Sequence, residues 1–243
     1  TWTKSSTLTN LDLFYSTDGS TWTTIVTGQS GTSYGWTPPV GAIGTSVKVR
    51  VKDADATHPL TQSDSNPVQV QGAFTFTTSP SGTLTVGTAT PVVWTKTSSI
   101  TNAGLYYVIG ATETLITTTS ATSLTWTVDN AAVAGTVSLR LKDADAGHPI
   151  ATKTSSTFGV KGILAFPANP SGTINVGDGP TVTFTKTGNI PTVNLYYTIG
   201  GTDTLISGGF AGTSLVWTVP AEGGVEQPLD VADLVARADR HDA

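Results

Sequence analysis

Residues 46–59 read Ser-Val-Lys-Val-Arg-Val-Lys-Asp-Ala-Asp-Ala-Thr-His-Pro, and residues 136–149 read Thr-Val-Ser-Leu-Arg-Leu-Lys-Asp-Ala-Asp-Ala-Gly-His-Pro. In both stretches apolar residues alternate with polar ones up to the Lys-Asp pair. This period of two predicts a strand with one buried face and one solvated face. The two stretches lie 90 residues apart, so the sequence predicts a structural repeat of about that length.

Three further landmarks recur with the same spacing. A Trp/Phe-Thr-Lys phrase begins at residues 2, 94 and 184, a Leu-aromatic-Tyr triplet at 13, 105 and 195, and a Trp-Thr pair at 36, 126 and 217. The short apolar runs between them are separated by Gly, Pro, Ser and Asn, which is typical of antiparallel sandwiches. We therefore predict an all-β chain of tandem immunoglobulin-like or fibronectin-type antiparallel β-sandwiches.

The landmarks divide the chain into three repeats and a tail. Repeat 1 is expected at residues 1–72 without its first strand, repeat 2 at 73–162 as a complete unit, and repeat 3 at 163–221 without its last strands. Residues 222–243 leave the repeat pattern and are acidic. Pro228 at a first-turn position, early acids, late arginines and one apolar face predict a short C-terminal helix there.

Aromatic residues at the recurring positions are expected to form the cores, because they stand at fixed places inside predicted strands. This set comprises Trp2, Tyr15, Trp36, Trp94, Tyr107, Trp126, Phe184, Tyr197 and Trp217. Trp22 has no counterpart in the other repeats, and it is predicted to be either an exposed contact or a staple over its own hairpin. The Asp-Gly pair just before it predicts a tight hairpin turn.

The order of motifs in repeat 2 carries a family resemblance. Ser-Pro-Ser-Gly-Thr from residue 79, Val-Trp-Thr from 93, Leu-Tyr-Tyr from 105, Trp-Thr-Val from 126 and Val-Ser-Leu-Arg-Leu-Lys-Asp-Ala from 137 follow one another. This order resembles the Ser/Thr-rich immunoglobulin-like tandem repeats of large microbial cell-surface proteins, including those similar to fungal cell-wall glucan-assembly proteins. The resemblance covers residues 1 to about 220. It implies a structural module and no particular activity.

Composition excludes several classes of function. The chain has no Cys and no Met, a net charge of −5 and only 12 scattered Lys and Arg, which argues against disulfides, thiol chemistry and nucleic-acid binding. No apolar stretch approaches the length of a membrane-spanning helix. Before residue 222 the His residues are His58 and His148, at the same place in two repeats. A duplicated active site would be unusual, so we predict no catalytic residues and no enzyme.

The Asp-Ala-Asp segments are the best candidates for a ligand site. Two carboxylates two residues apart can share a hard cation, so Asp53 with Asp55 and Asp143 with Asp145 are candidate calcium ligands. Calcium needs six to eight oxygens, however, and the segment lacks the acids of an EF-hand. A solvated hairpin whose Asp side chains cap backbone amides is the favoured interpretation, and no cofactor is predicted.

The sequence thus predicts a non-enzymatic extracellular or cell-surface segment, acting as a stalk, an adhesin array or a filament subunit. Its expected partners are neighbouring repeats or other copies of the chain, with head-to-tail assembly by strand donation through open sandwich edges. The alternative is a carbohydrate-binding module array of a secreted or cell-wall protein, with cell-wall or surface glycans as partners.

Overall fold

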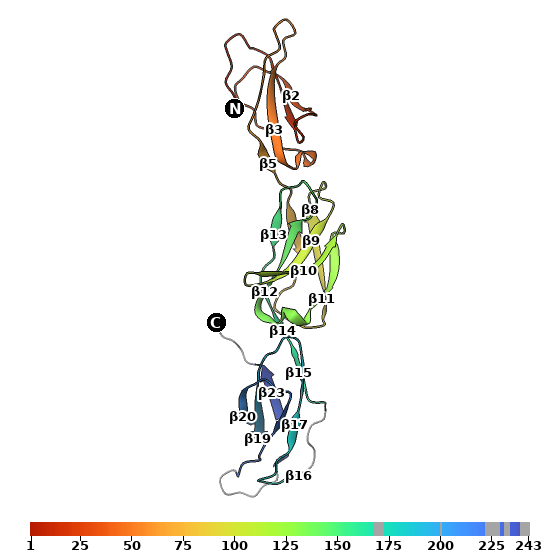
Figure 1. Ribbon diagram of the computed structural model, residues 1–243, viewed down its shortest axis with the longest axis vertical. Helices are drawn as coiled ribbons and strands as arrows, with labels where there is room; N and C mark the ends of the chain where they lie inside the picture. Colours follow the sequence, from red (N-terminus) through yellow and green to blue (C-terminus); the bar gives the residue numbers. More distant parts are fainter. Residues whose placement is uncertain (168–172, 200, 222–228, 231–233, 239–243) are drawn as a thin grey trace.

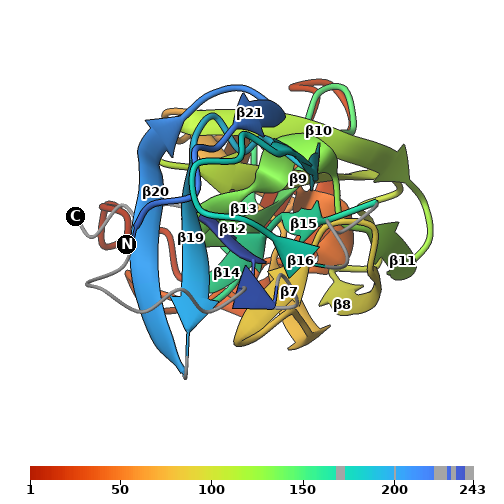
Figure 2. The ribbon, with the colours of Figure 1, turned by 90° about the horizontal axis from the view of Figure 1, so that it is seen from below.

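The computed structural model describes residues 1–167, 173–199, 201–221, 229–230 and 234–238. Figure 1 shows an elongated molecule in which three groups of strands follow one another end to end, the N-terminal group at the top. Figure 2 looks along the long axis, so that the groups lie behind one another. The described residues form strands and two short 3-10 turns, and the predicted all-β sandwich fold is confirmed.

Repeat 2 is an antiparallel sandwich of two sheets. One sheet has the strand order β10-β9-β12-β14-β7, with β13 also paired to β12, and the other has the order β11-β8-β6. β7 and β14 form a parallel pair. The elements are β6 (Phe74–Thr78), β7 (Thr83–Thr85), β8 (Ala89–Lys96), β9 (Ala103–Ile109), β10 (Thr112–Thr119), β11 (Ser123–Thr127), the 3-10 turn η2 (Asn130–Ala132), β12 (Ala134–Asp143), β13 (Thr152–Thr154) and β14 (Phe158–Lys161).

The core of repeat 2 lies between these sheets and follows from the alternation in the sequence. Val137, Leu139 and Leu141 of β12 are fully buried, whereas the polar residues between them reach the outer face. Trp94 of β8 and Trp126 of β11 belong to the same core cluster from the facing sheet, and Phe158 of β14 joins it beside Val137. Burial of this apolar surface is the dominant stabilising contribution, because the chain has no disulfide to add to it.

Repeat 1 has one regular sheet, ordered β2-β1-β3-β4 with β5 also paired to β3. Residues 1–4 form no strand, whereas the equivalent residues 93–96 of repeat 2 belong to β8. The amide of Trp2 nevertheless donates to the carbonyl of Thr32, as that of Trp94 does to Thr122. The elements are β1 (Leu11–Ser16), β2 (Thr23–Gln29), the 3-10 turn η1 (Val40–Ala42), β3 (Gly44–Asp53), β4 (Gln62–Asp64) and β5 (Val68–Val70).

Repeat 3 has smaller sheets: β15-β18, β17-β21, β16-β22 and β20-β19-β23. Its core is built around Val182, Phe184, Leu195 and Trp217. The elements are β15 (Ile163–Ala165), β16 (Thr173–Ile174), β17 (Thr181–Thr183), β18 (Thr185–Thr187), β19 (Val193–Ile199), β20 (Thr202–Phe210), β21 (Ser214–Val216), β22 (Leu229–Asp230) and β23 (Leu234–Ala238).

The predicted C-terminal helix is wrong where the structure describes the tail. Residues 234–238 form β23, which pairs with β19 in the register that β12 has with β9: Val193 faces Ala238 as Ala103 faces Asp143. The remaining tail residues, apart from β22, lie outside the described part of the chain. A helix of about a dozen residues is marginal alone, whereas the free edge of β19 offers backbone hydrogen bonds to any extended segment. The tail therefore supplies a strand that repeat 3 was expected to lack.

Candidate functional site

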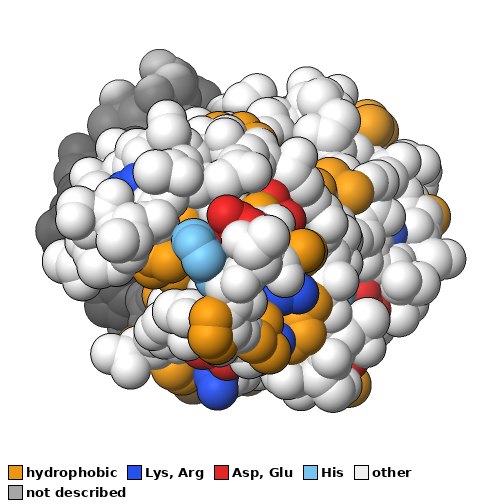
Figure 3. Space-filling view, turned by 90° about the horizontal axis from the view of Figure 1, so that it is seen from above, with side chains coloured by type: hydrophobic (Ala, Val, Ile, Leu, Met, Phe, Trp, Pro, Cys, Tyr) orange, Lys and Arg blue, Asp and Glu red, His pale blue; other side chains and the backbone are white. Residues whose placement is uncertain are grey.

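The acid–histidine loop, residues 53–58 in repeat 1 and 143–148 in repeat 2, follows the long strands β3 and β12. Each loop is closed at its base by one backbone hydrogen bond, from Asp53 N to Thr61 O and from Asp143 N to Ala151 O, both 2.9 Å. The loops stand at the N-terminal ends of their repeats. Figure 3 looks onto that end of repeat 1 and shows a histidine beside acidic side chains on its surface.

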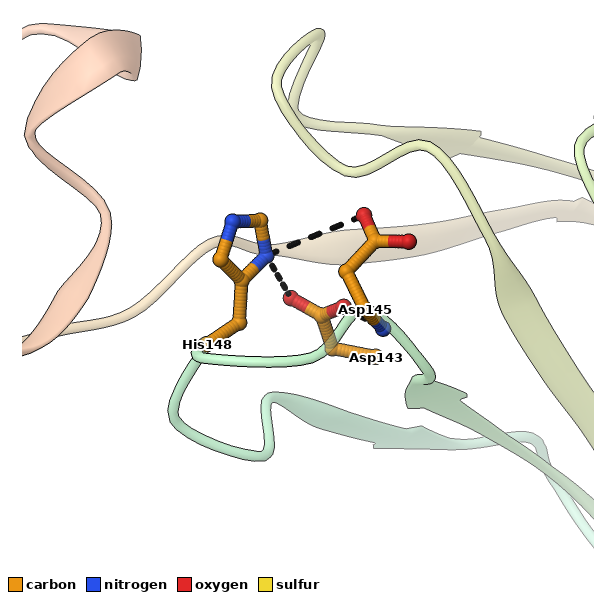
Figure 4. A group of neighbouring side chains, drawn as sticks. All are labelled: Asp143, Asp145 and His148. Carbon is orange, nitrogen blue, oxygen red and sulfur yellow. Dashed lines mark hydrogen bonds and ion pairs between the residues drawn. The ribbon is translucent and has the colours of Figure 1, made fainter.

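The first acid of each loop is buried and orders the loop around it. Asp53 is 7% exposed, accepts a hydrogen bond from the amide of Asp55 and lies 2.8 Å from Nδ1 of His58. Asp143 is 7% exposed, and its carboxylate contacts the amide of Asp145 and Nδ1 of His148 at 3.0 and 2.9 Å. In Figure 4 the ring of His148 turns toward both carboxylates. These contacts are the local capping bonds expected of a hairpin.

The second acid of the loop differs between the two repeats. Asp55 accepts hydrogen bonds from the hydroxyl and the amide of Thr57, and these bonds lower its pKa. Asp145 instead reaches across to another loop, where it accepts from the amide of Thr101 and from the amide and side chain of Asn102. Burial works to raise the pKa of Asp145, but these three bonds outweigh it and leave the pKa lowered.

His58 makes the stability of repeat 1 depend on pH. Its hydrogen bond to Asp53, with the negative charges of Asp55 and Asp53, raises its pKa above the ordinary 6.5 against the opposing effect of burial. A raised folded-state pKa stabilises the fold below the unfolded-state pKa, and this stabilisation is lost as pH rises through the folded-state pKa. We expect the substitution His58→Gln to lower the melting temperature at about pH 5 and to change it little at about pH 9. Thermal melts of both proteins at the two pH values, with an NMR titration of the ring, provide the measurement; equal losses at both pH values would contradict it.

The predicted calcium ligands are brought together with a histidine in repeat 2. One ligand atom each of Asp143, Asp145 and His148 lie within 4.8 Å of one another. The oxygens are already engaged by groups of the chain itself, however: Asp143 by its own loop and Asp145 by the loop that contains Thr101. A ring nitrogen is also a poor ligand for calcium, which prefers oxygen. The arrangement fits the favoured capping interpretation, and calcium binding stays the untested alternative.

The recurring aromatics differ in burial between repeats. Between 1% and 7% of the surface is exposed at Trp94, Tyr107, Trp126, Phe184, Tyr197 and Trp217. Trp2, Tyr15 and Trp36 of repeat 1 are only half-buried. The Tyr and Trp of each repeat still contact each other, with ring centroids 5.3, 6.1 and 5.2 Å apart in repeats 1, 2 and 3. The three half-buried aromatics all lie in repeat 1, which has a single regular sheet.

The ring of Trp22 is covered by a side chain from β3. The guanidinium of Arg50 lies 3.7 Å from the centroid of its ring, and Arg50 also forms a two-pronged ion pair with Asp64 at 2.6 and 2.9 Å. The hydrogen bond with Asp64 raises the pKa of Arg50. The predicted tight turn precedes Trp22, with Gly19 at a φ of 77°, where a side chain would be strained. Trp22 thus packs over the outer face of its own sheet.

A lysine clamp is a feature that the sequence interpretation missed. The lysine of every Trp/Phe-Thr-Lys phrase donates hydrogen bonds to two backbone carbonyls in different loops. The pairs are Lys4 with Leu8 and Ser30, Lys96 with Thr101 and Ser120, and Lys186 with Pro191 and Ala211. The recurrence of the lysine itself was the available signal, because a solvated lysine has no reason to recur in all three repeats.

The junctions between repeats are built from equivalent residues. At the first junction Gly72 lies against Ile43 of repeat 1 and Ile100 of repeat 2, and an added Cβ would be 3.0 and 2.6 Å from their Cδ1 atoms. At the second, Gly162 lies 90 residues later, where an added Cβ would be 2.5 Å from Cδ1 of Ile190. Close approach of this kind requires glycine.

The second junction carries two further contacts. The amide of Asn189 donates to the carbonyl of Asn130 in η2 at 2.8 Å, which joins repeat 3 directly to repeat 2. An added Cβ at Gly188, whose φ is 98°, would lie 2.7 Å from Val133, so the backbone of repeat 3 packs closely under repeat 2. Both junctions are therefore packed contacts between ends, with no long linker between them.

Comparison with known proteins yields distant structural likenesses. No family model matches the chain, and no curated protein matches it. Among solved structures, a tetra-tandem repeat in the extending region of a large adhesion protein is 13% identical with a TM-score of 0.39, over 96% of this chain and 65% of that one. The three N-terminal domains of the bacteriophage RB49 Highly Immunogenic Outer Capsid protein (Hoc) are 14% identical with a TM-score of 0.27, over 97% and 88%. The chicken CNTN1 FN1-FN3 domains are 9% identical with a TM-score of 0.28, over 96% and 90%.

The chain thus spans less than two thirds of the adhesion-protein repeat structure that it matches. Because these TM-scores are low, we draw no conclusion about this chain from the likenesses. The sandwich assignment rests on the strand order of repeat 2. Within the described residues, no helix has the length and apolar character needed to cross a membrane.

Proposed function

We propose that this chain is a non-enzymatic extracellular or cell-surface segment that acts as a spacer or adhesin stalk. The observation that carries the proposal is the repeated junction: Gly72 with Ile100 and Gly162 with Ile190 stack successive repeats in the same way. A stacked array sets a length and a direction, which is what a stalk needs. The two histidines of the repeats bond to acids of their own loops, which fits a structural role for those loops.

Assembly by strand donation is the finer part of the proposal. The edge of β19 pairs with β23, although the tail sequence does not belong to the repeat. This pairing supports the idea that backbone hydrogen bonds suffice for an open sandwich edge to accept an extended segment. A second copy of the chain is the partner that we expect for such edges, which would make the chain a filament subunit.

The alternative is a carbohydrate-binding module array. It needs exposed aromatic side chains that can stack on sugars. Trp22 is the tryptophan outside the recurring set, and Arg50 covers its ring. Tyr34, 41% exposed, is the aromatic residue that best supports this alternative. A glycan array probed with the labelled chain would favour it if binding were detected and were lost in the Tyr34→Ala variant.

Small-angle X-ray scattering and multi-angle light scattering on the purified chain test the spacer proposal. We expect a monomer at low concentration whose maximum dimension equals three repeats laid end to end. A compact particle would overturn the proposal, because it would mean that the junctions fold back. Growth into regular filaments with increasing concentration would select the assembly role over the plain stalk.

A further inference from the structure

The first junction depends on a loop that a side chain from elsewhere in repeat 2 holds in place. This junction loop, residues 97–102, carries Ile100, which is 1% exposed and packs against Gly72 and Ile43. Ile100 is therefore one point at which repeat 2 contacts repeat 1. A shift of this loop would move Ile100 and so alter the contact between the two repeats.

The acid–histidine loop of repeat 2 forms hydrogen bonds with two consecutive residues of the junction loop. Asp145 accepts the amide of Thr101 on one carboxylate oxygen, and on the other it accepts the amide and the side chain of Asn102, both at 2.9 Å. The amide of Ala144 donates to the carbonyl of Asn102 at 3.0 Å. Hydrogen bonds to an ionised carboxylate are stronger than neutral ones, and those of Asp145 are largely shielded from water. The side chain of Asp145 is 13% exposed.

Repeat 1 provides an internal comparison. Its equivalent loop makes the backbone bond from Ala54 to Asn10, at 2.9 Å, but its second acid turns to Thr57 within the loop. The side chain of Asp55 is 41% exposed, against 13% for Asp145, and that of His58 is 36% exposed, against 19% for His148. The hydrogen bonds between the second acid and the neighbouring loop are thus found in repeat 2, where the acid–histidine loop adjoins a packed junction.

We infer that the acid–histidine loop of repeat 2 is a brace, in which Asp145 holds residues 101–102 so that the junction between repeats 1 and 2 stays at one angle. Without the brace Ile100 would still be apolar and would still favour burial, but the loop that carries it could move as a hinge. The brace gives a role to the hydrogen bonds that Asp145 accepts from outside its own loop. The inference deepens the spacer proposal by naming what stiffens one junction.

Paired spin labels test the brace directly. The chain has no cysteine, so the pairs Ser63→Cys with Lys153→Cys, across the first junction, and Lys153→Cys with Thr202→Cys, across the second, label it cleanly. We expect Asp145→Asn, which cannot accept all three hydrogen bonds, to roughly double the width of the distance distribution across the first junction and to leave the second unchanged. The matched control Asp55→Asn should change neither width.

Unchanged width in Asp145→Asn would overturn the brace, and so would equal broadening in Asp55→Asn, which would indicate a general loop effect. If Asp145→Asn fails to fold, Asn102→Ala serves in its place, because it removes one of the three hydrogen bonds and should broaden the same distribution by a smaller amount. Failure of the brace is distinguishable from failure of the spacer proposal, since the scattering dimension of the unsubstituted chain reports the latter alone.

Discussion

Substitution of Trp94 by alanine is expected to destabilise repeat 2 by about 3–5 kcal/mol. Trp94 is 1% exposed and belongs to the core cluster of repeat 2. Its indole nitrogen is buried without a hydrogen-bond partner, so the loss comes from packing and from the cavity left behind. The measurement is denaturant unfolding monitored by hydrogen exchange of the amides in β8 and β9. These amides report on repeat 2 alone, which matters because separate repeats need not unfold in one step.

Trp2→Ala is the matched control for this substitution. Trp2 stands at the equivalent position of repeat 1, and its indole nitrogen also lacks a partner, but the residue is only half-buried. The loss should therefore be clearly smaller than at Trp94. An equal loss at both positions would mean that repeat 1 has a core as closed as that of repeat 2.

Substitution of Gly162 by alanine is expected to cost about 1–3 kcal/mol and to change the angle at the second junction. An added Cβ would lie 2.5 Å from the backbone oxygen of Thr187 and 2.5 Å from Cδ1 of Ile190. The oxygen cannot rotate away as a side chain can, so β18 or the linker itself has to shift. Thermal melting reports the cost, and small-angle scattering reports the change in shape.

Alanine substitutions at two other glycines serve as controls for Gly162→Ala. Gly135→Ala in β12 meets no atom within 4 Å and should be neutral or slightly stabilising, since it reduces the freedom of the unfolded chain. Gly72→Ala meets the ends of the Ile100 and Ile43 side chains, which can adjust, so its effect should fall between the other two. A cost at Gly162 no greater than at Gly135 would show that the second junction is not tightly packed.

Much of the fold was predictable because it depends on local patterns. The alternation of Val47, Val49 and Val51 with charged residues requires a strand with one buried face, and its return 90 residues later requires a second copy. The tail shows the limit of such reasoning. Residues 234–238 have a pattern compatible with a helix, and they form a strand because β19 offers a free edge. Local propensity is weak beside a set of tertiary hydrogen bonds.

The location of the candidate site could be predicted from the sequence. Its role could not, because that role depends on tertiary contacts. Asp55 and Asp145 occupy the same position of one motif, yet one bonds to Thr57 and the other to residues 101 and 102. The two motifs differ at one position, where repeat 1 has Thr57 and repeat 2 has Gly147, which has no hydroxyl to donate. The partners that Asp145 takes instead lie more than forty residues away along the chain, so they become visible only in the folded repeat. The lysine clamp is similar, since carbonyls of two loops meet one ammonium only after the sheets have formed.

By itself the sequence determined the fold class and the period of ninety residues, because hydrophobic alternation and repetition are properties of the chain alone. Tertiary structure alone decided how the repeats are joined. In the sequence, Gly72 and Gly162 look like ordinary linker residues. The structure shows that Ile100 packs against Gly72 and Ile190 against Gly162. Packing at a junction depends on residues distant in sequence, and so it becomes visible only when the ends of two folded sandwiches are brought into contact.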